Sequence, residues 1–153
     1  MLRDKLYRQG HQLEVVVGDC SRFPAMSEYN ENLPKACPPL NGIPLDVDVY
    51  RAVRAGGPSY YDFESHAERN DPRIDKNECE SWGLSVWLSL EHVEHARRMT
   101  PFFRKCRIAK IHVHHDHGVL CQTGVRKSHY TLWKKTSVDY LKNCVIALEP
   151  ANR

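Results

Sequence analysis

The most conspicuous group of chemistry-bearing side chains in this sequence is a run of four histidines and one aspartate. The run comprises His112, His114, His115, Asp116 and His117. On an extended strand His112 and His114 share one face, and a His-x-His pair can hold a transition metal when a third ligand comes from elsewhere. That ligand could be His66, Asp116, Cys121 or His129. The alternative is an exposed strand end without a ligand, and we favour it because this spacing is common by chance.

Arg51 is the second residue whose position suggests chemistry. The segment 45–54 alternates, so that Leu45, Val47, Val49, Arg51 and Val53 share one face. A guanidinium on an otherwise apolar face is costly unless a carboxylate pairs with it or it points into a cleft. Two interpretations stay open: an internal ion pair with Asp62 or Glu91, or a planar fork that binds a diphosphate or carboxylate ligand.

Three separated segments carry a further pattern. The residues from Val49 to Val53 form a strand with a central Tyr-Arg pair. The segment 82–97 places Ser85 two residues after a glycine and then turns into a helix with an alanine near its end. The segment 128–148 begins with His129 before an aromatic strand and closes with an apolar strand. In order and content these segments resemble the catalytic strands of the ADP-ribosyltransferase superfamily.

The resemblance implies a fold, a cofactor and a site. The fold would be α+β, with a split pair of small antiparallel sheets and a few short helices around a cleft. The cofactor would be NAD, and the acceptor a macromolecule, either protein or nucleic acid (RNA or DNA). Arg51, Ser85 and His129 would form the catalytic triad. The cofactor would contact Tyr50, Arg51, Tyr61, Ser85 and Trp87.

Two positions depart from the pattern of that superfamily. The glycine that usually follows the arginine is Ala52, and His129 stands where most members have a catalytic glutamate. A carboxylate would stabilise the positive charge that develops on the ribose as nicotinamide leaves, whereas an imidazole supplies no negative charge. Three outcomes stay open: a transferase with altered chemistry, a relative acting on an RNA phosphate, or a degenerate binding protein.

Each candidate residue also has a purely structural interpretation. Ser85 could be a hydrogen-bonded serine within a strand, and His129 could be a packed or exposed side chain. Trp82, Trp87 and Trp133 are expected in the core. No glycine-flanked nucleophile elbow, P-loop or Rossmann fingerprint occurs, so the sequence gives no support to hydrolase or Rossmann-type nucleotide chemistry.

The elements that must position these residues follow from periodicity and turn residues. We expect strands over 12–18, 45–54, 82–89, 107–114, 119–125, 130–133 and 143–148, and a helix over 90–100 with Ser89 as N-cap and Pro101 ending it. We also expect a helical turn over 138–141, and over 65–69 either a short helix or part of a long surface loop. Residues 1–44, rich in proline after residue 19, form an N-terminal wrapping around a core of 45–149. The whole chain, 1–153, is expected to be a single domain.

Composition excludes several classes of protein. The charged fraction of 27% and the hydrophobic fraction of 41% are those of a globular chain rather than a disordered one. The longest apolar run is far below the roughly 20 residues that a membrane helix needs, so we expect no membrane association. The charged start leads into no apolar stretch, so we expect no secretory signal. The six cysteines include no C-x-x-C pair. Because we expect no secretory signal, we expect reduced thiols in a cytoplasmic location and no disulfide framework.

The net charge of +3 decides little about partners, but its distribution suggests a rival function. Basic residues in the C-terminal half are interleaved with Phe102, Phe103, Tyr130 and Trp133, as in proteins that bind single-stranded nucleic acid. The leading expectation is NAD-dependent transfer to a macromolecular target. The alternative is a non-catalytic module that binds nucleic acid or protein through this C-terminal half.

Overall fold

The computed structural model describes residues 28–126 and 128–151 and has the mixed α+β composition that the sequence predicts. The strands are β1 (Val47–Val53), β2 (Leu84–Trp87), β3 (Arg107–Val113), β4 (Gly118–Gln122), β5 (His129–Lys134) and β6 (Val145–Leu148). The helices are α2 (Leu90–Met99), α3 (Pro101–Arg104) and the 3-10 turns η2 (Tyr60–Phe63) and η3 (Cys79–Trp82). The strand expected over 12–18 and much of the N-terminal wrapping lie outside the described residues.

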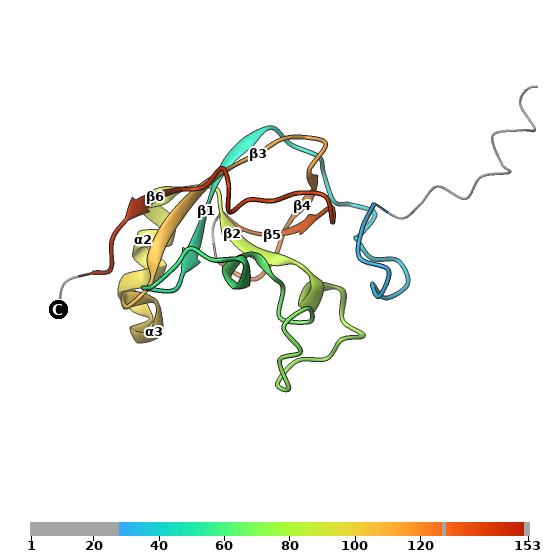
Figure 1. Cartoon of the computed structure of the whole chain (residues 1–153), viewed down its shortest axis with the longest axis horizontal. Coiled ribbons are helices and arrows are strands. Elements are labelled where there is room, and N and C mark those ends of the chain that lie inside the picture. Colours follow the sequence, from blue (N-terminus) through green and yellow to red (C-terminus); the bar gives the residue numbers. More distant parts are fainter. Residues whose placement is uncertain (1–27, 127, 152–153) are drawn as a thin grey trace, which may run out of the picture.

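The six strands form one antiparallel sheet in the order β4-β5-β2-β1-β3-β6 (Figure 1). All residues of β1 pair with β3, but β1 and β2 are joined by the single pair Tyr50 and Trp87. The sequence predicted two separate sheets, and the strands instead form one whose halves, β4-β5-β2 and β1-β3-β6, meet at this narrow junction. Beyond it, towards Arg51 on β1 and Ser85 on β2, no further pairs form.

The two faces of β1 are covered by different apolar clusters. Val49 and Val53 are buried in the larger cluster, together with residues of β2, β3, β4 and β5. Tyr50 and Ala52 pack on the other side against a smaller cluster that includes Val93 of α2. Because burying an aliphatic side chain stabilises the fold by about 1.5–3 kcal/mol, this two-sided burial fixes the strand that carries Arg51.

Sequence signals at both ends account for helix α2, whereas two other predicted helical segments are not helical in the structure. Ser89 caps α2 as expected, and its Oγ accepts a hydrogen bond from the amide of His92 at 3.3 Å. Pro101 follows the end of α2 and also begins α3, because proline is tolerated in the first turn of a helix. The helix expected over 65–69 is a set of turns, and the helical turn expected over 138–141 is a bend that leads into a turn.

A long segment, residues 54–83, connects β1 to β2 and hangs below the sheet in Figure 1. It contains η2 and η3 but no longer element. The buried Asp62 holds its beginning, because the Asp62 carboxylate accepts hydrogen bonds from the amides of Arg54 and Ser59 at 3.0 and 2.8 Å. Near its end, the Ala67 amide donates to the Ser81 carbonyl. This connection therefore has a defined path despite its polar sequence.

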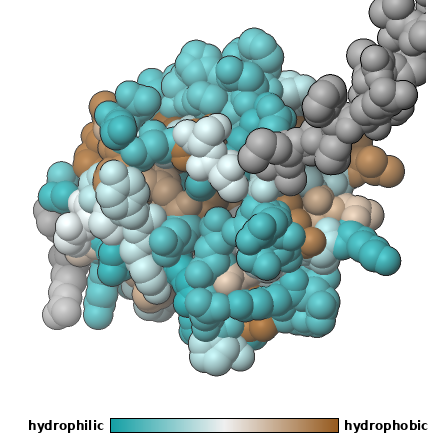
Figure 2. Space-filling model, turned by 45° about the vertical axis from the view of Figure 1, so that its right-hand side comes forward, coloured by the Kyte–Doolittle hydropathy of each residue, from teal (hydrophilic) through white to brown (hydrophobic). Residues whose placement is uncertain are grey.

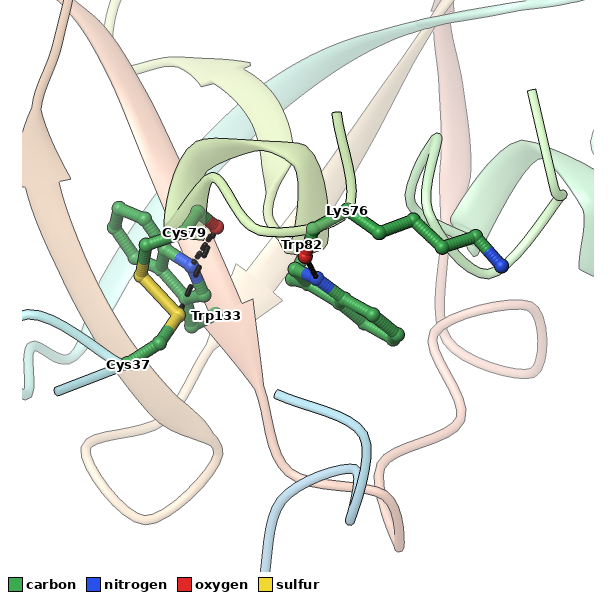
Figure 3. Close-up of a disulfide and its surroundings, with 5 residues drawn as sticks. All are labelled: Cys37, Lys76, Cys79, Trp82 and Trp133. Atoms are coloured by element: carbon green, nitrogen blue, oxygen red, sulfur yellow. Dashed lines mark hydrogen bonds between the residues drawn. A yellow bond between two sulfur atoms is a disulfide. The ribbon is translucent and has the colours of Figure 1, made fainter. Parts of the chain in front are cut away.

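A disulfide between Cys37 and Cys79 corrects the expectation that the cysteines are reduced. Figure 3 shows the bond beside Trp133, whose indole nitrogen donates to the Cys79 carbonyl at 2.9 Å. The two cysteines are 42 residues apart, so no local motif reveals the pair. Structural disulfides are typical of oxidising compartments. The cytoplasmic location, which was expected together with reduced thiols, stays a prediction.

The described part of the N-terminal wrapping runs along the β4 edge of the sheet. Ile43 and Leu120 exchange two backbone hydrogen bonds there, at 2.8 and 2.9 Å. On the face seen in Figure 2 the surface is mostly hydrophilic, and hydrophobic residues reach it in separate patches. Within residues 28–126 and 128–151, no helix combines the length and the apolar character that crossing a bilayer demands.

Candidate functional site

A cavity of about 420 Å³ opens where β1 and β2 stop pairing. Its walls come from the end of β1, the connection after it, the start of β2 and helix α3. The residues lining it include Arg51, Tyr61, Arg69, Ser85, Trp87 and Phe103. Four of the residues that the sequence predicted for the site, Arg51, Tyr61, Ser85 and Trp87, are thus brought together. We call this cavity the main cleft.

The Arg51 guanidinium spans the gap between the diverging strands. Its Nε donates to the backbone carbonyl of Asp62 at 2.6 Å, and its Nη1 donates to the backbone carbonyl of Ser85 at 2.8 Å. No carboxylate of the described residues lies within 4.0 Å of it, so neither of the ion pairs considered from the sequence forms. Burial and the charge of Arg69 lower the pKa of Arg51 to about 10, against the opposing effect of Asp62. Arg51 is therefore a cation at neutral pH, held by carbonyl oxygens in the wall of the cleft.

Asp62 does not pair with Arg51 because other donors occupy its carboxylate. Besides the two amides, Asp62 accepts from the Arg54 Nε at 3.3 Å and from the Ser59 hydroxyl at 3.1 Å. Burial alone would raise the pKa of Asp62, but these hydrogen bonds outweigh it and lower that pKa. A Cβ at position 57 would overlap the carboxylate, so glycine is required there for the loop to close.

Two further arginines contact the ring of Tyr61. The guanidinium carbons of Arg54 and Arg69 each lie over the ring, 4.2 Å from its centroid. Both contacts are cation–π interactions. Tyr61 lines the cleft, and these contacts position the two arginines beside it.

Arg69 is the residue of the site that sequence reasoning missed. It lines the main cleft, its Nε is buried without a hydrogen-bond partner, and no carboxylate among the residues described pairs with it. A buried donor without a partner costs about 1–3 kcal/mol, which a ligand acceptor would recover. Because Arg69 lies in a polar connection with no periodicity, its only sequence signal is its residue type.

Ser85 presents an exposed side chain to the cleft from β2. The Ser85 hydroxyl has no hydrogen-bond partner within the described part of the chain, so it is available to a ligand. Opposite it on β5 lies the buried Thr131, whose Oγ1 is 2.8 Å from the Oγ1 of Thr123. Gly83 makes this packing possible, since a Cβ there would overlap Cγ2 of Thr131.

His129 touches the main cleft only through Trp87. The two residues are paired across β2 and β5, and their rings meet edge to face with centroids 4.9 Å apart. The His129 Nδ1 lies 2.9 Å from the carbonyl oxygen of Thr123 and donates to it, which leaves Nε2 without that proton in the neutral ring. His129 is on the same sheet face as Ser85, but it does not line the cavity.

Tyr50 is the other predicted residue that does not line the cleft. It faces the opposite side of β1 from Arg51, since neighbouring residues of a strand alternate. There it packs against the cluster of Trp87, Val93, Ala96 and Ile108. The neighbouring Tyr50 and Arg51 therefore lie on opposite faces of the strand, and only Arg51 lines the cleft.

The histidine run forms contacts with carboxylates. The His112 Nδ1 is 2.7 Å from Asp48, and the His115 Nδ1 is 3.1 Å from Asp46. His114 lies near Asp46 and stacks edge to face on His112 and His117. In the portion of the chain that is described, no three His, Cys, Asp or Glu side chains are placed to hold a metal ion.

The basic residues of the C-terminal half are mostly engaged within the protein. Arg107 pairs with Glu149, Lys110 with Asp48 and Lys135 with Glu28. Arg97 is buried and donates to the Glu149 carbonyl. Trp133 is also buried, although Phe102 is largely exposed. These contacts occupy part of the basic residues that the sequence had assigned to nucleic-acid binding.

Comparison of the chain with protein-family models, with curated proteins and with solved structures finds no match. The functional argument therefore depends on the geometry of the two arginines, the serine and the cavity that they line.

Proposed function

We propose that the main cleft binds NAD and that the protein transfers ADP-ribose from it to a macromolecular acceptor. The observation that supports this proposal is the convergence of Arg51 and Ser85 on one cavity. They come from β1 and β2, two of the segments that resemble catalytic strands of ADP-ribosyltransferases, and they lie 34 residues apart in the sequence. The narrow junction between the halves of the sheet supports the same architecture, because it leaves a cleft between β1 and β2.

Two of the cations that line the cleft suit a diphosphate, although Asp62, Glu64 and Asp71 line it as well. Arg51 and Arg69 both line it, and neither is neutralised by a carboxylate of the described residues. Guanidinium groups bind phosphate oxygens through two parallel hydrogen bonds and remain charged at neutral pH. A cavity of about 420 Å³ with an apolar wall that includes Trp87 and Phe103 is large enough to hold part of a dinucleotide.

In this proposal the remaining residues orient the ribose. The free Ser85 hydroxyl bonds the nicotinamide ribose. The sequence assigned His129 to the ribose or the acceptor, but from outside the cavity it can act only by holding Trp87 through their edge-to-face contact. The bond between the ribose C1′ and nicotinamide breaks with its electron pair passing to nicotinamide, the acceptor nucleophile bonds to C1′, and its proton passes to solvent. Because His129 brings no negative charge to that centre, we expect slow transfer.

The test is titration calorimetry of the protein with NAD. Arg51→Ala should abolish measurable binding, and Arg51→Lys should weaken it, because lysine keeps the charge but loses the planar fork. Lys142→Ala removes an exposed cation outside the cleft and should bind like the wild type. Circular dichroism of each variant separates lost binding from lost folding.

Two results would count against the proposal. Unchanged NAD affinity in a folded Arg51→Ala variant would exclude the main cleft as the binding site. Chromatography measures the release of nicotinamide with water as the acceptor. If NAD binds and no nicotinamide is released, the protein is a binding module and not a transferase.

A further inference from the structure

A second cavity, of about 320 Å³, shares Trp87 with the main cleft as a lining residue. Trp87, His92, His95, Ala96, Met99 and Arg126 line it. Helix α2 contributes four of these residues, and Arg126 comes from the connection between β4 and β5. Trp87 lines both cavities, and His129 stacks on its edge. We call this cavity the side pocket.

The polar side chains that line the side pocket are basic or potentially basic. They are His92, His95 and Arg126, and no carboxylate of the described residues lines it. The main cleft differs, since Asp62, Glu64 and Asp71 are among its lining residues. The side chains of His95 and Arg126 have no hydrogen-bond or ion-pair partner in the described part of the chain. The pocket therefore presents unneutralised donors to an anionic ligand.

The remaining walls of the side pocket are apolar. Trp87, Ala96 and Met99 supply them, and Met99 is exposed at the rim. Apolar and aromatic walls with basic groups at the edge are what single-stranded nucleic acid requires, because the bases need apolar contact and the phosphates need cations. The volume is sufficient for one base with its sugar and too small for a duplex.

The two sides of the side pocket are held together by hydrogen bonds. The His92 Nδ1 is 2.7 Å from the Ser128 hydroxyl, and the Leu88 amide donates to the Ser128 carbonyl at 3.0 Å. Ser128 has a φ of 56°, in the left-handed region. These contacts fix the β4–β5 connection to the start of α2, so the pocket is formed before a ligand arrives.

We propose that the side pocket takes an unpaired base of a single-stranded nucleic acid, whose phosphates contact Arg126 and His95. This inference rests on the proposed function in one respect: the bound nucleic-acid strand would be the macromolecular acceptor of ADP-ribose. The side pocket and the main cleft are separate cavities, so the base in the side pocket anchors the strand and another nucleotide of the same strand would be the acceptor.

The experiment measures fluorescence anisotropy of a labelled 12-nucleotide single-stranded RNA titrated with the full chain. The variant Arg126→Ala/His95→Ala should weaken binding roughly tenfold or more. The slope of log affinity against log salt concentration should decrease by the equivalent of about one phosphate contact. Met99→Glu, at an exposed position of the rim, should weaken binding by a similar factor through charge repulsion. The matched control His115→Ala/Lys142→Ala removes one exposed histidine and one exposed cation elsewhere and should bind as the wild type does.

Several results would overturn the inference. They are equal binding of the corresponding duplex, equal loss in the matched control, and tighter binding of a poly-glutamate peptide than of the RNA. The proposed function is tested separately, because Arg51→Ala should retain RNA binding and Arg126→Ala/His95→Ala should retain NAD binding in calorimetry. Loss of RNA binding with intact NAD binding therefore locates the defect in the side pocket alone.

Discussion

At the scale of single residues, the close approach of β2 to β5 beside Ser85 depends on Gly83. A Cβ at this position would overlap Cγ2 of Thr131 and lie 3.3 Å from the Trp133 ring. Thr131 cannot move freely, because its hydroxyl is bonded to Thr123. The position thus has no room for a side chain, although the backbone there is ordinary extended chain.

We predict that Gly83→Ala lowers the free energy of unfolding by about 1–3 kcal/mol through overpacking. Thr131→Ser removes the clashing methyl group and keeps the hydroxyl, so the double variant should recover part of the loss. Urea denaturation of the two single variants and the double variant measures this coupling. Gly56→Ala is the control, because nothing lies within 4 Å of a Cβ at that position. Additive losses in the double variant would contradict the explanation.

Asp62 allows a second prediction at this scale. Asp62→Asn keeps the side-chain volume but presents amide hydrogens to donors on Arg54 and Ser59, so unfolding should become easier by about 2 kcal/mol. Asp139→Asn changes a more exposed carboxylate that pairs with Lys142 and should cost less than about 1 kcal/mol. Equal melting temperatures for the two variants would show that the Asp62 network does not hold the connection.

The residues of the site could be predicted from the sequence only in part. Arg51 was recognisable because it interrupts an apolar alternation, and Ser85 because of the resemblance of its strand. Tyr50 was assigned to the cofactor through its neighbour, yet strand alternation turns it to the other face. Arg69 escaped prediction because its significance arises from stacking on Tyr61 and from a missing partner, which are tertiary properties.

At the scale of elements, the connection between β1 and β2 forms one wall of the main cleft and is cross-linked by the disulfide of Cys37 and Cys79. Closing a loop over 42 residues restricts the unfolded chain, which corresponds to about 4 kcal/mol in the chain-entropy account. The Trp133 indole adds a hydrogen bond at the same place (Figure 3). The wall of the cleft therefore depends on a covalent tie to the N-terminal segment.

We predict that Cys37→Ser/Cys79→Ser lowers the free energy of unfolding by about 2–4 kcal/mol. A dithiol reductant should destabilise the wild type by a similar amount and should leave this double variant unchanged. Cys121→Ser, at a cysteine outside the disulfide, is the control and should keep the response to reductant. Urea denaturation with and without reductant measures each case. A wild type insensitive to reductant would show that the two cysteines are not bonded.

The elements themselves followed from periodicity more closely than the sheet did. Alternation predicted β1 and β3 to within two residues at each end, and the serine cap predicted the start of α2. The bend over 138–141 was mistaken for a helical turn because single turns carry no period. The joining of two expected sheets into one depends on a single cross-strand pair, Tyr50 and Trp87, which no local pattern encodes.

At the scale of the whole molecule, the groups with shifted pKa values set the pH range in which the fold is most stable. Hydrogen bonds from His115, His112 and Arg73 lower the pKa values of Asp46, Asp48 and Asp71 below the ordinary 3.8. A lowered pKa in the folded state gives stability above the unfolded value and loses it as the pH falls through the folded value. Protonation of these carboxylates therefore destabilises the fold in strong acid.

His117 extends the acid sensitivity towards neutral pH. Burial and the neighbouring His114 lower its pKa from the ordinary 6.5. Its contribution to stability is complete above that value and decreases as the pH falls through its folded pKa. On the alkaline side, burial raises the pKa values of Cys106 and Cys144 above 9.0 and that of Tyr140 above 10.0. Raised values give stability that is lost as the pH rises, so the maximum lies at about pH 7–8.

We predict that the melting temperature begins to fall below about pH 6.5, well before the carboxylates titrate, and that His117 causes this first decrease. His117→Gln should flatten the curve below about pH 6.5, because glutamine does not titrate and its amide oxygen can accept the hydrogen bond that the His114 amide donates to Nδ1. His95→Gln changes an exposed histidine and should leave the curve as it is. Calorimetric scans across this range measure the slope. The same slope in wild type and His117→Gln would assign the decrease to other groups, and the exposed contacts of Asp46 and Asp48 with the remaining histidines would be the next to examine.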